Sequence, residues 1–380
     1  MTNEYDKDMR ARRAQKALKR RVTYEIMHMD SVVAQLSSSG DARVLLPLFM
    51  PYDLWLDEDE DDDIDTLVNN MVNFYHWCSS RMLTLDRKYA KEIMNSIGAA
   101  QAVTDRDRAE IALSYRCLTL TDVYWVRESG DDVSFSGIDL YDHHLDDALV
   151  PLALRGRQMT VTNNEMASDI STRGLYPKAW IRRGDDFILL KDGGTDAVRR
   201  ELAASRICQC FDFRQVVYTE GMFEDEPVTE SRLITSKRYS IVSKMAFDIF
   251  AVNNDIDTLS ECLRLDPVTY YGMNIIDYLT GNTDRHPENW GFLVDNSTNT
   301  AVSLYPLMDF NQCFNSYDNI DGASCQTVLP VRMTQREAAI DAVKHIGLRQ
   351  VKDIEASLFD DVPEWCDMFF LRLNELKKYL

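Results

Sequence analysis

Hydrophobic and polar positions follow different periods along the chain, and these periods outline its expected elements. The stretch VTYEIMHMDSVVAQLS, from Val22, is rich in β-branched and aromatic residues and predicts two strands joined by a turn at 28–31. Residues 65–83 repeat apolar side chains at helical spacing and predict a helix. Further helices are expected over 86–98, 196–210, 244–252, 256–263 and 267–280, and further strands over 117–126, 214–219 and 231–243.

Two segments have the pattern of β-hairpins. In KAWIRRGDDFILLK, two apolar runs flank Arg183-Gly184-Asp185, a turn sequence, and the second run ends at Lys191. In WGFLVDNSTNTAVSLYPLMDF, a strand to Val294 is followed by a polar turn and a returning strand from Ala301. We therefore expect a hairpin in each segment.

The last two helices are predicted from their start signals. Thr334 and Glu337 are spaced as a capping box. Asp361 and Glu364 have the same spacing, with Pro363 in the first turn. The whole chain reads as a mixed N-terminal part, a β-rich layer with one helix, and a helical lobe, which indicates an α+β fold.

Composition narrows the class of protein. The chain has 380 residues, of which 45% are hydrophobic, enough for two or three domains with their own cores. No apolar run approaches the roughly 20 residues of a membrane span, and the charged N-terminus lacks the apolar region of a secretory signal. Eight cysteines without a C-x-x-C pair predict buried thiols in a reducing compartment, the cytoplasm.

Charge is unevenly distributed along the sequence. The net charge of −20 argues against nucleic acid or an anionic membrane binding to most of the surface. Residues 7–21 nevertheless hold eight Lys and Arg, and residues 57–65 (DEDEDDDID) hold eight acids. Blocks of like charge usually remain solvated, so we expect a basic arm and a solvated acidic loop rather than binding segments.

The segment GNTDRHPENWGF, residues 281–292, concentrates groups that bind metals or protons. Asp284 and Asn289 are five residues apart, the spacing of the base and the metal-binding Asn in the protein-kinase loop H-R-D-x-x-x-x-N. The order here is D-R-H, so Arg285 and His286 follow the aspartate. We expect His286 to orient this loop.

A second acid is expected to join this loop. The hairpin that begins at Trp290 returns the chain to Asp309-Phe310-Asn311, which resembles D-F-G with Asn as its third residue. Asn tolerates left-handed backbone better than most residues, so the turn can persist. Asp309 beside Asn289 would supply two hard oxygen ligands for Mg²⁺.

A cation for nucleotide phosphates is expected in the first hairpin. Lys191 ends the apolar strand FILLK, and Glu201 follows ten residues later on the next helix. A strand lysine held by a helix carboxylate is the ion pair that orients ATP phosphates in kinases. Glu220 and the acids at 224–226 compete with Glu201 for this position.

A short turn precedes the same hairpin. In SDISTRGLYPKAW, the residues Ser171, Thr172 and Gly174 form a flexible turn whose N–H groups could bind phosphate, aided by Lys178. A single glycine is a weak signal compared with G-x-G-x-x-G. We therefore place these four residues in the nucleotide site on the strength of their neighbours.

Together these residues resemble the HipA-type serine/threonine kinases over about residues 22–330. The matching set comprises Ser171, Gly174, Lys178, Lys191, Glu201, Asp284, His286, Asn289 and Asp309. The resemblance implies a two-lobed kinase-like fold with a β-rich N-lobe, an N-terminal extension and a helical C-lobe. The corresponding parts are a basic arm over 1–21, an N-terminal subdomain over 22–157, the kinase N-lobe over 158–243 and the C-lobe over 244–380.

The resemblance also implies an activity. ATP and Mg²⁺ would be the cofactors, and the γ-phosphoryl group would pass to Ser or Thr of a protein. Asp284 would be the base, Asn289 and Asp309 would hold Mg²⁺, and Lys191 would contact ATP phosphates. Autophosphorylation of Ser171 would place about two negative charges where ATP phosphates bind and inactivate the enzyme. Many relatives are toxins that act with a small DNA-binding antitoxin partner.

Two alternatives stay open at this point. The D-R-H-x-x-N order also resembles phosphoinositide kinases, although residues 310–331 contain no Lys or Arg to bind an anionic head group. A non-catalytic ATP-binding regulator is the second alternative. The intact set of Lys191, Asp284, Asn289 and Asp309 favours an active enzyme, and the charge of −20 favours a neutral or basic protein substrate.

Overall fold

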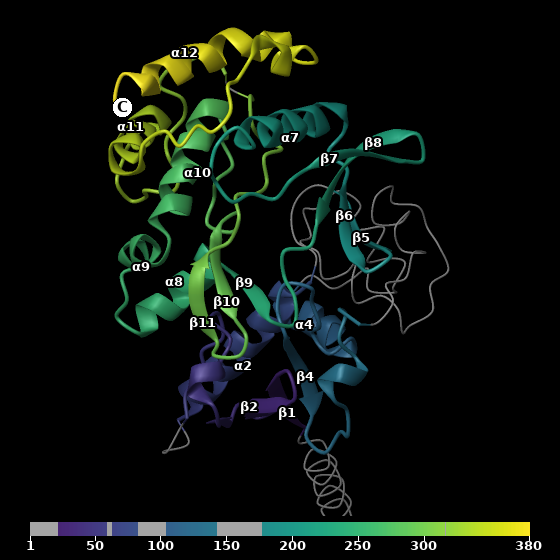
Figure 1. The fold of residues 1–380 in the computed structure, drawn as a ribbon. Helices are drawn as coiled ribbons and strands as arrows, with labels where there is room; N and C mark the ends of the chain where they lie inside the picture. Colours follow the sequence, from purple (N-terminus) through teal and green to yellow (C-terminus); the bar gives the residue numbers. More distant parts are fainter. Residues whose placement is uncertain (1–21, 59–62, 83–103, 143–176, 316) are drawn as a thin grey trace, which may run out of the picture. The chain divides into compact units, whose positions relative to one another are not determined.

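The structure is a computed structural model that describes residues 22–58, 63–82, 104–142, 177–315 and 317–380 (Figure 1). Contacts between backbone positions divide these residues into two compact units. The first contains the described residues up to 119 together with 123–142, and the second contains 120–122 and the described residues from 177 onward. The expected arm, the helix over 86–98, the boundary at 157/158 and the turn with Ser171 lie outside the described residues.

The first unit is built on a four-stranded antiparallel sheet. Its strand order is β3-β2-β1-β4, and β1 pairs with both β2 and β4. The strands are β1 (Thr23–His28), β2 (Ser31–Ser37), β3 (Ala42–Val44) and β4 (Tyr124–Glu128), with helices α2 (Ile64–Ser80) and α4 (Asp105–Ser114) and 3₁₀ turns η1 (Pro47–Phe49) and η2 (Phe135–Gly137). The paired strands over 22–37 and the helix over 65–83 are therefore confirmed.

The strand expected over 117–126 begins later than predicted. Residues 117–120 are buried but irregular, and β4 starts only at Tyr124. Arg116 and Cys117 have left-handed backbone, with φ of 61° and 56°, which interrupts an extended strand. The Arg81 guanidinium donates to the carbonyl oxygens of Cys117 and Tyr124, at 2.6 and 3.1 Å, so it links the irregular segment to the first residue of β4.

The second unit begins with a four-stranded antiparallel sheet in the order β5-β6-β8-β7. The predicted hairpin is confirmed as β5 (Lys178–Arg183) and β6 (Asp186–Lys191), which places Lys178 directly opposite Lys191. Helix α7 (Thr195–Cys208) follows and contacts β8 (Glu226–Arg232). A small core of Ala179, Ile188, Leu190 and Val228 lies in this sheet.

The strands expected over 214–219 and 231–243 are largely displaced. The structure instead has β7 (Thr219–Phe223) and β8, joined by a tight turn at Glu224 and Asp225, both with positive φ. Residues 214–218 lie beside the segment that contains Leu307: the Val216 N–H donates to the Leu307 carbonyl oxygen at 2.8 Å. Nothing in the local sequence identifies a partner ninety positions away.

The remaining sheet has the order β11-β10-β9, and it contains the second predicted hairpin. Its strands are β9 (Tyr239–Ser243), β10 (Gly291–Asp295) and β11 (Thr300–Leu304). The helices of this part, three of which were predicted with close boundaries, are α8 (Lys244–Asn253), α9 (Thr258–Leu265), α10 (Pro267–Thr280), α11 (Gln335–Ile346) and α12 (Cys366–Lys377). Helix α10 contacts α9, α11 and α12 and is buried along nearly its whole length (Figure 1).

One predicted helix cap is confirmed and the other is wrong. Thr334 and Glu337 form the expected capping box at α11. Residues Pro363–Trp365 form a 3₁₀ turn, η5, and α12 starts at Cys366 without a side-chain cap. Asp361 and Glu364 instead pair with Arg206 and Arg199 of α7, at 3.2 and 3.3 Å, so a tertiary ion pair replaces the local cap.

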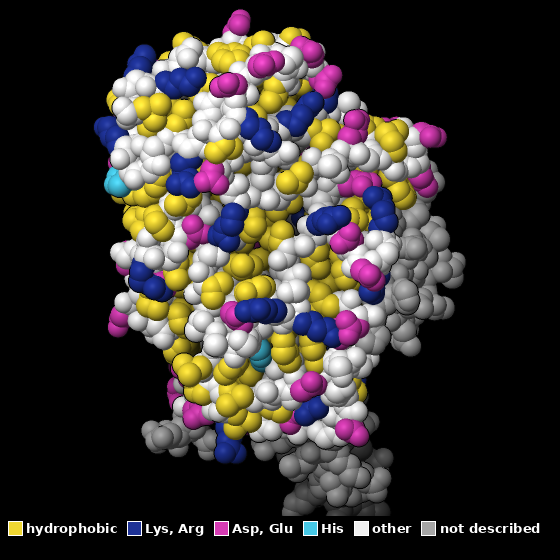
Figure 2. Space-filling view, in the orientation of Figure 1, with side chains coloured by type: hydrophobic (Ala, Val, Ile, Leu, Met, Phe, Trp, Pro, Cys, Tyr) yellow, Lys and Arg dark blue, Asp and Glu magenta, His cyan; other side chains and the backbone are white. Residues whose placement is uncertain are grey.

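Side chains of both charge signs occur on the protein surface (Figure 2). On the face drawn in Figure 2, basic side chains lie among acidic ones. Within the described ranges, no helix combines the length and the apolar character needed to cross a bilayer. The turn Ala356–Phe359 (η4) packs against α7 and completes the described elements of this unit.

The cysteines are free thiols, and seven of the eight are buried, as predicted. Burial raises the pKa of the Cys262 thiol to about 12, so little reactive thiolate forms there at neutral pH. Only Cys366 is partly exposed. We expect iodoacetamide to alkylate Cys366 first in the folded protein and all eight in urea, as measured by peptide mass spectrometry. Rapid modification of any buried cysteine in native buffer would contradict this packing.

Candidate active site

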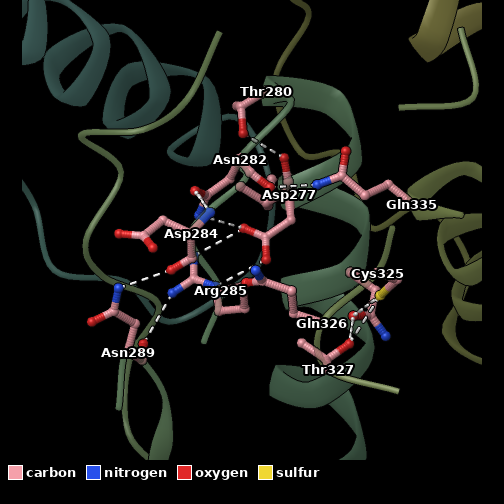
Figure 3. A network of polar contacts seen from close by, with 12 residues as sticks. Asp277, Thr280, Asn282, Asp284, Arg285, Asn289, Cys325, Gln326, Thr327 and Gln335 are labelled. Carbon is pink, nitrogen blue, oxygen red and sulfur yellow. Dashed lines mark hydrogen bonds and ion pairs between the residues drawn. The ribbon is translucent and has the colours of Figure 1, made fainter. Parts of the chain in front are cut away.

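The segment 281–289 is held at the end of α10 by an aspartate of that helix. Gly281 ends α10 with φ of 63°, and a side chain there would approach a Tyr317 ring carbon to 2.7 Å. Asp277 accepts hydrogen bonds from Asn282 Nδ2 at 3.0 Å and from Arg285 Nε and Nη2, both at 2.9 Å (Figure 3). The loop is therefore fixed to a buried helix by its own polar side chains.

Arg285 connects this loop to the segment before Asp309. Besides its ion pair with Asp277, its Nη1 donates to the carbonyl oxygens of Asn289 and Met308, at 3.0 and 2.7 Å. Arg285 and Asp277 are both buried. A buried guanidinium with this many partners fixes geometry, because each of its bonds would be costly to leave unmade.

A hydrogen bond links Asn289 to the main chain of Asp284 within the loop. The Asn289 Nδ2 donates to the Asp284 carbonyl oxygen at 2.8 Å (Figure 3), which orients the amide. Among the described residues, none donates a hydrogen bond to Asn289 Oδ1, so this oxygen is available to a cation. The Asp284 side chain is 35% exposed. Burial raises the pKa of the Asp284 carboxyl group. His286 lowers this pKa, and the negative charge of Asp309 raises it further.

Lys191 joins two carboxylates that are far apart in the sequence. Its Nζ lies 2.9 Å from Glu201 Oε1 and 2.5 Å from Asp309 Oδ1. Lys191 is 7% exposed and Glu201 1%. The other oxygen of Glu201 accepts from Thr229 Oγ1 on β8, at 2.6 Å. The structure thus brings together Lys191, Glu201 and Asp309, and Glu201 rather than Glu220 is the partner.

The ionisation of this cluster follows from its charges. Burial alone would lower the pKa of Lys191, but the Asp309 and Glu201 carboxylates raise it well above its ordinary value. Burial likewise opposes ionisation of Asp309, yet Lys191 and then Lys178 lower its pKa. Lys178 therefore lies within electrostatic reach of Asp309. Two lysines and two carboxylates share one charged region.

The expected nucleotide and metal fit these side chains. Asp309 and the free Asn289 Oδ1 are oxygen donors of the kind that Mg²⁺ prefers. Lys191 and Lys178 are opposed on neighbouring antiparallel strands, which places their side chains on the same face of the sheet. This arrangement suits the phosphates of ATP. Ser171, Thr172 and Gly174 lie outside the described residues, so their place in the site stays a prediction.

His286 contacts the loop that we expected it to orient. Its Nε2 lies 3.8 Å from Asp284 Oδ1, and its Nδ1 accepts from the Glu288 N–H at 3.2 Å. A place for His286 in the nucleotide site stays a prediction. In Asp309-Phe310-Asn311 the left-handed residue is Asp309, with φ of 61°, rather than Asn311.

The sequence alone did not identify Asp277 or Tyr218 in the site, and it gave no sign that Arg285 binds the Met308 carbonyl oxygen. Asp277 anchors the loop, Arg285 reaches Met308, and Tyr218 accepts a hydrogen bond from the Asp309 N–H at 3.1 Å. Only Asp277 left a signal, because it is an acid within an apolar helical run, MNIIDYL. Such an acid is buried only with a partner.

Comparisons with known proteins support the fold. No protein-family model matches the chain, and no curated protein sequence matches it. The structure of HipA from Shewanella oneidensis, solved with HipB and operator DNA, is 11% identical, with a TM-score of 0.56, and covers 94% of this chain and 99% of its own. The proinflammatory kinase CtkA of Helicobacter pylori is 15% identical over 53% of this chain and 90% of its own, with a TM-score of 0.40. The HipA likeness confirms the predicted α+β, two-lobed kinase-like fold: this chain is HipA-like in fold.

Proposed function

We propose that this chain is an ATP- and Mg²⁺-dependent serine/threonine protein kinase of HipA type. The observation that supports it most is the contact of Lys191 with both Glu201 and Asp309. Asp309 also influences the charge of Asp284, so base, metal ligand and phosphate cation share one region. A base, a metal ligand and a cation for the phosphates are the parts that phosphoryl transfer requires.

Asp284 would accept the proton of the attacking hydroxyl. Its side chain is partly exposed, as a base that meets a protein substrate must be. Asn289 and Asp309 would hold Mg²⁺, which when bound neutralises charge on the phosphates. The Asn289–Asp284 hydrogen bond fixes the base and the metal ligand relative to each other.

Lys191 and Lys178 would bind the phosphates of ATP. Glu201 keeps Lys191 extended toward the site, and Lys178 faces the same side of the sheet. We further propose that Ser171, Thr172 and Gly174 line the phosphates and that phosphorylation of Ser171 inactivates the enzyme by charge repulsion. A cytoplasmic toxin that acts with a small DNA-binding antitoxin completes the proposal, with the HipA–HipB–DNA assembly as its support.

The test is transfer of labelled phosphate from ATP by the full chain. We expect the wild type with Mg²⁺ to label itself and a protein substrate in a lysate, with Ser171 phosphorylated as mapped by mass spectrometry. Asp309→Asn should reduce labelling about a hundredfold or more, because a metal ligand and a Lys191 partner are both weakened. Asp341→Asn, an exposed acid on α11, serves as the matched control.

Four results would contradict the proposal or a part of it. Labelling of phosphoinositide vesicles but of no protein would favour a lipid kinase. ATP binding without transfer in the wild type would favour the regulator. Undiminished labelling by Asp309→Asn would mean that the metal ligand is misassigned, and Ser171 unmodified in an autophosphorylated enzyme would refute the inhibitory site alone.

A further inference from the structure

The peptide group between Met308 and Asp309 is held at both of its ends. Its carbonyl oxygen, on Met308, accepts from Arg285 Nη1 at 2.7 Å. Its N–H, on Asp309, donates to the Tyr218 hydroxyl oxygen at 3.1 Å. Because these two atoms belong to one planar group, the two bonds together fix its orientation.

This orientation matters because the next backbone angle is strained. Asp309 has φ of 61°, a left-handed conformation that is unfavourable for residues with a side chain, although Asp and Asn adopt it more readily than most. The rest of the structure must hold such a residue in place. Lys191 holds its carboxylate, and Tyr218 and Arg285 hold the preceding peptide group.

Tyr218 is held in position by its own contacts. Its side chain is buried, and its own N–H donates to Ser205 Oγ of α7 at 3.1 Å. Its ring meets Phe310 edge-on, with centroids 6.1 Å apart. Two residues earlier, the Val216 N–H donates a hydrogen bond to the Leu307 carbonyl oxygen. The hydroxyl is therefore placed by α7, by the segment before Asp309 and by the residue after it.

We propose that Tyr218 is a positioning residue for Asp309, and that its hydroxyl keeps the Asp309 carboxylate directed at Lys191 and at the metal. This inference rests on the proposed kinase function. Without the hydroxyl, the Asp309 N–H loses its partner. Rotation of the peptide group could pair that N–H elsewhere only by breaking the Arg285–Met308 bond. Either change loosens the carboxylate that would bind Mg²⁺.

The chemistry of a phenol suits this position. A neutral hydroxyl accepts the N–H of Asp309 without competing with that residue's carboxylate for Lys191.

The test is Mn²⁺ binding to the full chain loaded with a non-hydrolysable ATP analogue, measured by electron paramagnetic resonance. Tyr218→Phe keeps the ring and removes only the oxygen. We expect it to weaken Mn²⁺ affinity about three- to tenfold, the range for one lost hydrogen bond. Tyr270→Phe is the matched control, since Tyr270 is buried in the same unit and donates to the Thr327 carbonyl at 3.4 Å. Its Mn²⁺ affinity should equal that of the wild type.

The outcomes separate this inference from the proposed function. Unchanged Mn²⁺ affinity in Tyr218→Phe, or an equal loss in Tyr270→Phe, overturns the role of Tyr218 while leaving the kinase proposal intact. A wild type that binds neither the analogue nor Mn²⁺ overturns both. If Tyr218→Phe does not fold, the Mn²⁺ affinity of Ser205→Ala is measured instead. This variant removes the hydrogen bond to the Tyr218 N–H and keeps the Tyr218 hydroxyl. Weaker Mn²⁺ binding supports the role, and wild-type affinity overturns it.

Discussion

Asp284→Asn is expected to lower kcat for phosphoryl transfer by about 10²- to 10⁴-fold, the usual contribution of a general base. The substitution preserves the shape of the side chain but replaces the carboxylate that accepts the proton with a neutral amide. The Asp284 main chain should stay in place, because its N–H donates to Asn282 Oδ1 and its carbonyl accepts from Asn289. Steady-state kinetics with labelled ATP would measure kcat, and calorimetry would show ATP affinity within about twofold of the wild type.

The result distinguishes chemistry from binding. Asp341→Asn on α11 makes the same chemical change at an exposed position and should retain wild-type kcat. If kcat of Asp284→Asn were within a few-fold of the wild type, another group would be the base. A loss of ATP affinity equal to the loss of rate would instead assign Asp284 to nucleotide binding.

Arg285→Met is expected to lower the free energy of unfolding by about 3–5 kcal/mol, because it leaves the buried Asp277 carboxylate without its cation. The carbonyl oxygens of Asn289 and Met308 lose their donor in the same step. Activity should fall together with stability, since both loops of the site lose their common anchor. Urea denaturation followed by circular dichroism would give the free energy.

A double variant separates charge from architecture. Asp277→Leu combined with Arg285→Met removes both charges, so its loss of stability should be smaller than the sum of the two single losses. Its activity should stay low, because the bonds to Asn289 and Met308 remain absent. Strict additivity of the two losses would show that the ion pair contributes nothing as a pair.

Much of the fold was predictable from the sequence because it rests on local rules. The hairpins of β5–β6 and β10–β11 are specified by alternating apolar runs around turn residues. The helices follow from apolar spacing, and α11 also from its capping box. Each of these signals lies within a few residues, so a single sequence contains all of it.

The candidate site was predictable only as separate pieces. Asp284 and Asn289 lie on one loop, and their spacing identified them without any structure. Glu201 was one of several acids that could have paired with Lys191. Burial decided between them, because Glu201 faces inward from α7 while Glu220 lies exposed on β7.

The sequence by itself determined the local elements and the chemical types of the site residues, because periodicity, turns and caps act over a few positions. Only the tertiary structure decided that Lys191 meets Asp309, 118 positions later, and that Tyr218 and Arg285 hold one peptide group from its two ends. It also turned Asp361 and Glu364 from expected caps into partners of α7. Contacts of this kind depend on how buried groups find partners once the chain is packed, and no local pattern records that choice.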